Sequence, residues 1–166
     1  MTPAGRAGGA QGAGRLTHLD EQGRARMVDV TAKPVTHRRA VARCVVRADE
    51  AAIDKLPSGD ADPLAGAKVA GVQAAKLTYQ LIPLCHPLLL DDIRVDVDRV
   101  DGGLAVRATA TVQDRTGVEM EALTACGAAG LSLVMALLPL DPMATVEELT
   151  LWHKSGGRSG TWERRP

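Results

Sequence analysis

The residues best placed to do chemistry lie in one short loop, where Cys85 and His86 stand between Pro83 and Pro87. A proline disfavours helical backbone in the residue before it, so Ile82 and His86 are both predicted to be extended. Such a loop could present an imidazole to a ligand, although an isolated histidine is more often a structural hydrogen-bonding group. Cys85 is not predicted to be a nucleophile activated by His86, because neighbours in an extended segment point to opposite sides.

A second candidate is Thr116–Glu121, which precedes a long apolar segment. Thr116 and Glu119 fit the capping-box pattern of a helix start, and this spacing alone favours Glu119 as a cap. The alternative is that Glu119 and Glu121 bind donor groups of a heterocycle or move a proton. No second Cys or His stands at the spacing of zinc ligands, so we predict no metal site.

The third candidate is Lys154–Gly160, which combines glycines, hydroxyl groups and two cations. Its backbone N–H groups could surround a phosphate while Lys154 and Arg158 neutralise the charge. The segment does not have P-loop spacing, and a simple turn is an equal alternative.

The hydrophobic pattern indicates how these segments are positioned. An α+β domain of the ferredoxin-like, split βαβ type is predicted, with an antiparallel sheet and the helices on one face. The face without helices indicates an oligomer. The predicted order is a strand at 40–48, a helix at 63–82 capped by Asp62, strands at 93–97 and 104–112, a helix at 117–138 and a strand at 148–153.

Composition narrows the possible functions. Twenty basic and twenty acidic residues cancel, and with no Phe, one Tyr and two Trp there is little for bases to stack on, so no nucleic-acid partner is expected. Three cysteines without paired spacing are typical of a reduced, cytoplasmic protein. Residues 122–140 carry no charge, but their Gly, Ser, Thr and Ala content favours a helix buried in protein over a membrane span. We expect a flexible leader at 1–15, one domain at 16–162 and a tail at 163–166.

Four motifs together resemble the cyclic pyranopterin monophosphate synthases of molybdenum cofactor biosynthesis. They cover residues 16–162 in the family's order and read LTHLDEQGRARMVDVTAK, AGVQAAKLTYQLIPLCHPL, TGVEMEALTA and HKSGGRSGTW. The resemblance implies a lyase that rearranges cyclised dihydro-GTP into cyclic pyranopterin monophosphate and releases pyrophosphate without metal or cofactor. It also implies a homohexamer, a trimer of dimers, with active sites between subunits.

The resemblance also assigns residues. Lys33, His86 and Glu119 fall on the family's catalytic positions. Its substrate-binding positions are matched by Leu84, Cys85, His86, Met120, Glu121, Lys154 and Arg158.

Three positions depart from the family pattern. The family's long helix carries a catalytic Asp and, three residues later, a Lys, where this sequence has Met135 and Leu138; Ser58 replaces a further Lys, and Lys55 could reach in from nearby. A second hypothesis follows, namely a catalytically impaired relative that binds a pterin or nucleotide, or that assembles with an active synthase.

Overall fold

The computed structural model describes residues 18–165. The predicted leader at 1–15 lies outside this range, as do the first two residues of the predicted domain. The described part forms five strands, four α-helices and a short 3-10 helix. In chain order these are β1 (Thr36–Arg47), α1 (Glu50–Ile53), the 3-10 turn (Gly59–Ala61), α2 (Pro63–Lys76), α3 (Thr78–Leu81), β2 (Asp92–Val100), β3 (Gly103–Asp114), α4 (Glu119–Leu137), β4 (Thr145–Ser155) and β5 (Trp162–Glu163).

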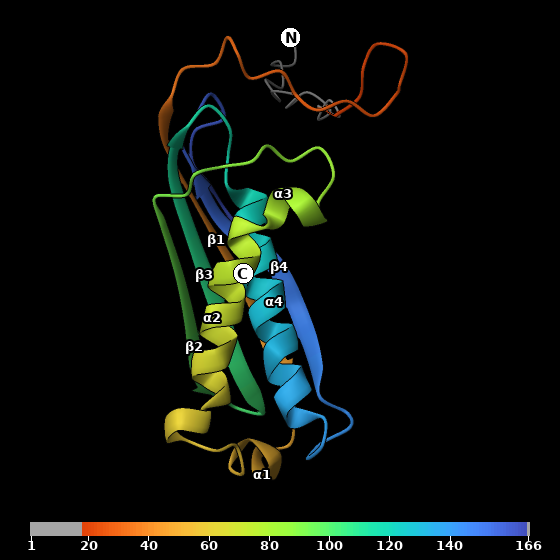
Figure 1. Ribbon diagram of the computed structural model, residues 1–166, viewed down its shortest axis with the longest axis vertical. Coiled ribbons are helices and arrows are strands. Elements are labelled where there is room, and N and C mark those ends of the chain that lie inside the picture. The colour runs from red at the N-terminus through yellow and green to blue at the C-terminus, as the bar shows by residue number, and fades with distance from the viewer. Residues whose placement is uncertain (1–17, 166) are drawn as a thin grey trace, which may run out of the picture.

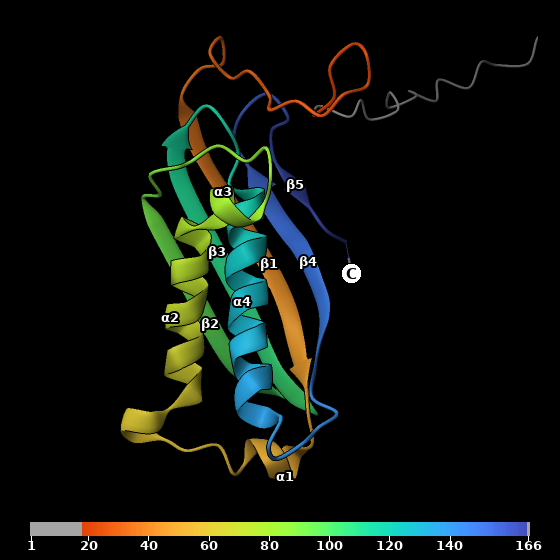
Figure 2. The same ribbon diagram turned by 45° about the vertical axis from the view of Figure 1, so that its right-hand side comes forward.

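The strands form one antiparallel sheet in the order β2-β3-β1-β4-β5, with α2 and α4 side by side on one face (Figures 1 and 2). Leaving aside β5, two strand–helix–strand units interleave so that β1 lies between β3 and β4. This is the predicted ferredoxin-like arrangement, and the α+β prediction is confirmed. The short β5 was not predicted, and it makes Glu163 part of the sheet and not of a tail.

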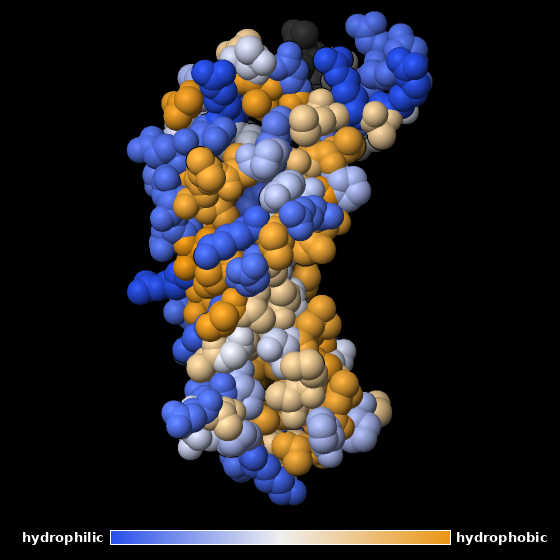
Figure 3. All heavy atoms as spheres, in the orientation of Figure 1, coloured by the Kyte–Doolittle hydropathy of each residue, from blue (hydrophilic) through white to orange (hydrophobic). Residues whose placement is uncertain are grey.

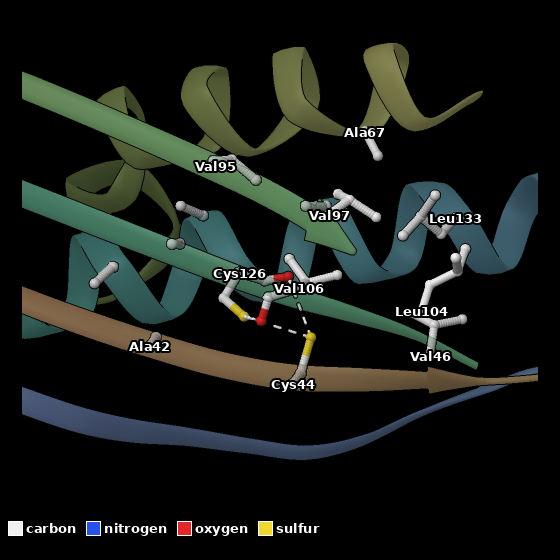
Figure 4. Packing of buried hydrophobic residues seen from close by; sticks show 14 of the residues in the cluster. Ala42, Cys44, Val46, Ala67, Val95, Val97, Leu104, Val106, Cys126 and Leu133 are labelled. Atoms are coloured by element: carbon white, nitrogen blue, oxygen red, sulfur yellow. Dashed lines mark hydrogen bonds between the residues drawn. The ribbon is translucent and has the colours of Figure 1, made fainter. Parts of the chain in front are cut away.

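Small aliphatic side chains build the core between sheet and helices. Alternate residues of β1 point towards α4 and pack against its inward side. All of the residues in this contact are buried: Ala40, Ala42, Cys44 and Val46 of β1, and Ala122, Ala125, Ala129 and Leu133 of α4. The Sγ atoms of Cys44 and Cys126 lie 3.4 Å apart in this layer, both as free thiols (Figure 4). Within residues 18–165 no aromatic side chain belongs to the buried core, so a high packing density is reached by close approach of the backbones. A Cβ at Gly71 of α2 would lie 2.8 Å from the carbonyl oxygen of Ala125.

The first long helix starts as predicted but ends early. The Asp62 side chain accepts a hydrogen bond from the N–H of Leu64 at 2.8 Å, which is an N-cap followed by Pro63 in the first turn. The helix ends at Lys76 instead of residue 82, because Leu77 leaves helical geometry with φ −103° and ψ 6°. The hydrophobic spacing continues through α3, so the break could not be read from periodicity. In contrast, β1 and β4 are longer than the strands predicted at 40–48 and 148–153.

The two faces of the molecule differ in polarity. The sheet face opposite the helices carries Arg39, Arg43 and Arg107, so it is a charged surface. By length and composition α4 could cross a membrane, but it packs along the sheet and α2. Its outward side leaves large apolar residues exposed, and hydrophobic residues gather over the two helices in Figure 3. α4 therefore carries exposed apolar side chains, whereas the open sheet face carries arginines.

Candidate functional site

A cleft of about 430 Å³ lies at the end of the molecule where four loops meet, at the top of Figures 1 and 2. All the predicted site residues line it: Lys33, Leu84, Cys85, His86, Glu119, Met120, Glu121, Lys154 and Arg158. The histidine loop and the glycine-rich loop, which are about 70 residues apart in sequence, thus face one space within a single chain. The fold brings them together because the loop after α3, the entrance to α4 and the end of β4 all lie at one end of the sheet.

The histidine loop is held in an unusual conformation. Leu84, with φ 69°, adopts the left-handed region, which costs a non-glycine residue about 1–2 kcal/mol. The N–H of Cys85 donates to the carbonyl oxygen of Ile82 at 3.3 Å, closing the turn. Burial, and secondarily the charge of Glu121, raises the pKa of the Cys85 thiol. The thiol is therefore protonated at neutral pH, and a protonated thiol is a poor nucleophile.

The capping-box prediction for Glu119 is wrong. Val118 is the N-cap residue of α4, and no side chain caps this end. Glu119 instead lies over Gly117, where a Cβ would clash with its Oε2 atom, and its Oε1 forms an ion pair with Lys154 Nζ at 3.3 Å. The ion pair with Lys154, across the cleft, holds the Glu119 carboxylate away from the N-terminal end of α4. The segment Thr116–Glu121 and the glycine-rich loop are thus joined through this ion pair.

Glu121 is the carboxyl group most altered by its surroundings. It is only 4% exposed, and this burial, with a smaller contribution from the charge of Glu119, raises its pKa to about 7. A carboxyl group with a pKa near the working pH can both hold and release a proton. The cleft therefore contains one ion-paired carboxylate, Glu119, and one carboxyl group, Glu121, that is partly protonated near neutral pH.

Arg38 is a cleft residue that the sequence interpretation missed. Its side chain is 8% exposed, and its Nε and Nη2 atoms donate to the carbonyl oxygens of Asp114 (3.3 Å) and Arg115 (3.2 Å). Its Nη1 occupies the space that a Cβ of Gly157 would need, at 1.7 Å. The guanidinium therefore joins the end of β3 to the glycine-rich loop. Its position in β1, on the same side as the core residue Ala40, was a usable signal, since an inward arginine must be hydrogen-bonded.

Arg115, also missed, connects the cleft to the segment before β1. Its Nη1 donates to the carbonyl oxygen of Thr31 at 2.9 Å. The sequence analysis found no periodicity in this segment, and the structure has turns and one isolated bridge, Leu19 to Ala25. This contact helps to place Lys33 at the cleft.

The charge of the cleft indicates its ligand. Six cationic side chains face it against the two carboxylates, namely Lys33, Arg38, Arg39, Arg115, Lys154 and Arg158. A concave site with this excess of positive charge fits a polyanion. Within residues 18–165 no three His, Cys, Asp or Glu side chains come together as a metal site requires. That the reaction needs no metal or cofactor stays a prediction.

The three residues that depart from the family pattern lie outside the cleft. Met135 and Leu138 are 70% and 46% exposed, and neither they nor Ser58 line the cleft. Met135 stands sixteen residues after Glu119 in α4, which corresponds to about 24 Å along the helix axis. In Figures 1 and 2 this end of α4 is at the bottom, and the loops whose residues line the cleft are at the top. Met135 and Leu138 thus cannot act in the cleft of their own chain.

Comparison with known proteins decides the family. The model of the MoaC family matches residues 27–157, which include every predicted site residue except Arg158. The chain belongs to the MoaC family.

Three members of the family from different organisms are about half identical to this chain. Cyclic pyranopterin monophosphate synthase 2 of Mycobacterium tuberculosis is 50% identical over 159 residues, covering 92% of this chain and 93% of the relative. The cyclic pyranopterin monophosphate synthase of Novosphingobium aromaticivorans is 48% identical over 151 residues (89% and 96%), and that of Thermomicrobium roseum 50% over 154 residues (90% and 93%).

Proposed function

We propose that this chain is a cyclic pyranopterin monophosphate synthase, a lyase of molybdenum cofactor biosynthesis. It converts cyclised dihydro-GTP (3′,8-cyclo-7,8-dihydroguanosine triphosphate) to cyclic pyranopterin monophosphate and releases pyrophosphate. The observation that carries the proposal is the convergence of all predicted site residues on one cationic cleft, in a chain about half identical to synthases over most of its length. The alternative of an impaired relative is not favoured by these comparisons.

The cleft suggests a division of roles. Lys154 and Arg158 on the glycine-rich loop, with the buried Arg38 behind it, bind the triphosphate of the substrate. Leu84, Cys85 and Met120 contact the base-derived ring system, and Glu121 hydrogen-bonds its donor groups.

His86, Glu119 and Lys33 carry the proton transfers of the rearrangement. In the free protein Glu119 is paired with Lys154 at 3.3 Å. A phosphate group that binds Lys154 would compete for this pair and release the carboxylate to act as a base.

The assembly implied by the family is part of the proposal. Large apolar side chains stay exposed along the outward side and far end of α4, namely Leu131, Met135, Leu138, Leu140 and Met143. Contiguous exposed apolar residues mark contact surfaces. We propose a cytoplasmic homohexamer, a trimer of dimers, with active sites between subunits. Light scattering should give six times the chain mass of 17.4 kDa.

The test of the function supplies purified protein with the cyclised GTP intermediate and follows cyclic pyranopterin monophosphate and pyrophosphate together. We expect both products in equal amounts from the native chain, and none from Glu119→Gln. Binding of the intermediate without either product would contradict the enzyme and favour the impaired relative.

A second experiment addresses Met135 and Leu138. Positioned acid–base groups typically contribute 10²- to 10⁴-fold to a rate. If a neighbouring chain presents this end of α4 to the cleft, Met135→Asp with Leu138→Lys should raise turnover at least about 10²-fold. The matched control is Leu131→Asp, which adds a carboxylate one helical turn away on the same side and should not raise it. An equal response to both changes would show that these positions lie outside the active site.

A further inference from the structure

The open face of the sheet, opposite α2 and α4, carries a second concentration of positive charge. A depression of about 300 Å³, which we call the arginine basin, lies over the middle of β1. Val41, only 3% exposed, forms its floor. The walls come from β1, β3, β4 and the residues around β5, and consist of Arg39, Arg43, Arg107, Trp152, His153, Glu163 and Arg164.

The basin brings like charges together. Arg43 and Arg107 are direct cross-strand partners in the β1–β3 register, and like charges so placed destabilise a sheet. Among residues 18–165 no carboxylate lies within 4.0 Å of the charged nitrogens of the four basin arginines, and Glu163 is engaged with His153 at 3.1 Å. Asp96 is the β2 partner of Arg107, but its carboxylate is paired with Arg94 at 4.0 Å. The basin is therefore short of negative charge.

Two of the arginines are held in place before any ligand arrives. The guanidinium of Arg43 lies 4.3 Å from the centre of the Trp152 ring, a cation–π arrangement. The Nε of Arg164 donates to the carbonyl oxygen of Leu151 at 3.0 Å. Guanidinium groups fixed in this way keep their remaining N–H groups available, and these match the oxygens of phosphate in pairs.

We propose that the arginine basin is a second anion-binding site, separate from the cleft, for a compact polyanion of the phosphate class with the size and charge of inorganic pyrophosphate. Its volume is at the lower limit of small-molecule sites, which argues against a whole nucleotide. Arg39 lines both the basin and the cleft, so the two positive regions are adjacent. The basin does not depend on the proposed reaction, because its residues are not those of the cleft apart from Arg39.

Calorimetric titration of the full chain with inorganic pyrophosphate at constant ionic strength tests the site. We expect two binding events in the native protein. Arg43→Gln with Arg107→Gln should weaken one of them at least tenfold, since two charge-assisted contacts are removed. Lys154→Gln with Arg158→Gln should weaken only the other. Arg94→Gln, an arginine of β2 outside the basin, is the matched control and should change neither.

Fluorescence identifies the site independently. In Trp162→Phe the remaining tryptophan, Trp152, lies under Arg43 and should report pyrophosphate binding in the basin. This signal should persist in the Lys154→Gln, Arg158→Gln protein and vanish in the Arg43→Gln, Arg107→Gln protein, whose circular dichroism should remain native.

Two results would overturn the proposal. One is a single binding event that only the Lys154 and Arg158 changes weaken. The other is absence of any Trp152 response together with a changed molecular mass in the Arg43→Gln, Arg107→Gln protein, because the basin would then be covered by another chain.

Discussion

Gly157→Ala tests whether the buried arginine and the glycine-rich loop form one unit. Gly157 has φ 70°, where an alanine costs about 1 kcal/mol or somewhat more. Its new Cβ would also lie 1.7 Å from Arg38 Nη1, so the guanidinium must move. Arg38 makes two part-buried hydrogen bonds to backbone carbonyl oxygens, and bonds from a charged donor contribute about 1.5–3 kcal/mol each. Losing one of them brings the expected total to about 3 kcal/mol.

Gly160→Ala is the matched control. Gly160 also has positive φ, 63°, but nothing lies within 4 Å of a Cβ there. It should therefore lose only the backbone contribution of about 1 kcal/mol. Urea unfolding followed by tryptophan fluorescence measures both free energies, and the difference of about 2 kcal/mol is the contribution of Arg38. Equal losses in the two variants would refute the coupling between Arg38 and the loop.

Three further changes have outcomes that stability measurements can check. Gly71→Ala should cost about 1–2 kcal/mol, since the Cβ meets a backbone oxygen at 2.8 Å, whereas Gly66→Ala in the same helix has open space and should gain about 0.5–1 kcal/mol; a gain at both sites would contradict the described packing. Asp62→Ala removes the cap on the N–H of Leu64 and should cost about 1 kcal/mol in urea unfolding, and no loss would show that the cap is not formed. The folded chain keeps the Glu121 proton up to pH about 7 while the unfolded chain releases it near 4.5, so this group lowers stability as pH rises between these values, by up to about 3 kcal/mol. Glu121→Gln should remove that decline and equal the native chain below pH 4.5, and an unchanged pH profile would show that Glu121 titrates normally.

Much of the fold could be predicted because the strands have one wet face. The alternation of Ile93, Val95 and Val97 with charged residues set the start of β2 within one residue, and the Asp101–Gly103 turn fixed its partner. The predictions that failed were the positions at which helices and strands end. α2 ends at Lys76 because the backbone of Leu77 leaves helical geometry, although the hydrophobic pattern continues to residue 82.

The site could be predicted as a set of residues but not as a geometry. Local motifs identified Glu119 and Lys154 separately, and only the fold shows that they form an ion pair. The capping interpretation failed because sequence spacing contains no information on a cation arriving from β4. Arg38 and Arg115 were missed for a related reason, since their partners are backbone carbonyls distant in sequence or on neighbouring loops.

The length of α4 has a consequence for how activity depends on protein concentration. Its first turn supplies the carboxylates of the cleft, and its last turn, about 24 Å away, ends in exposed apolar residues. Chemistry that used both ends could be done only by two chains. Specific activity would then fall on dilution, and two inactive variants, each damaged at a different end of the helix, would regain activity when mixed.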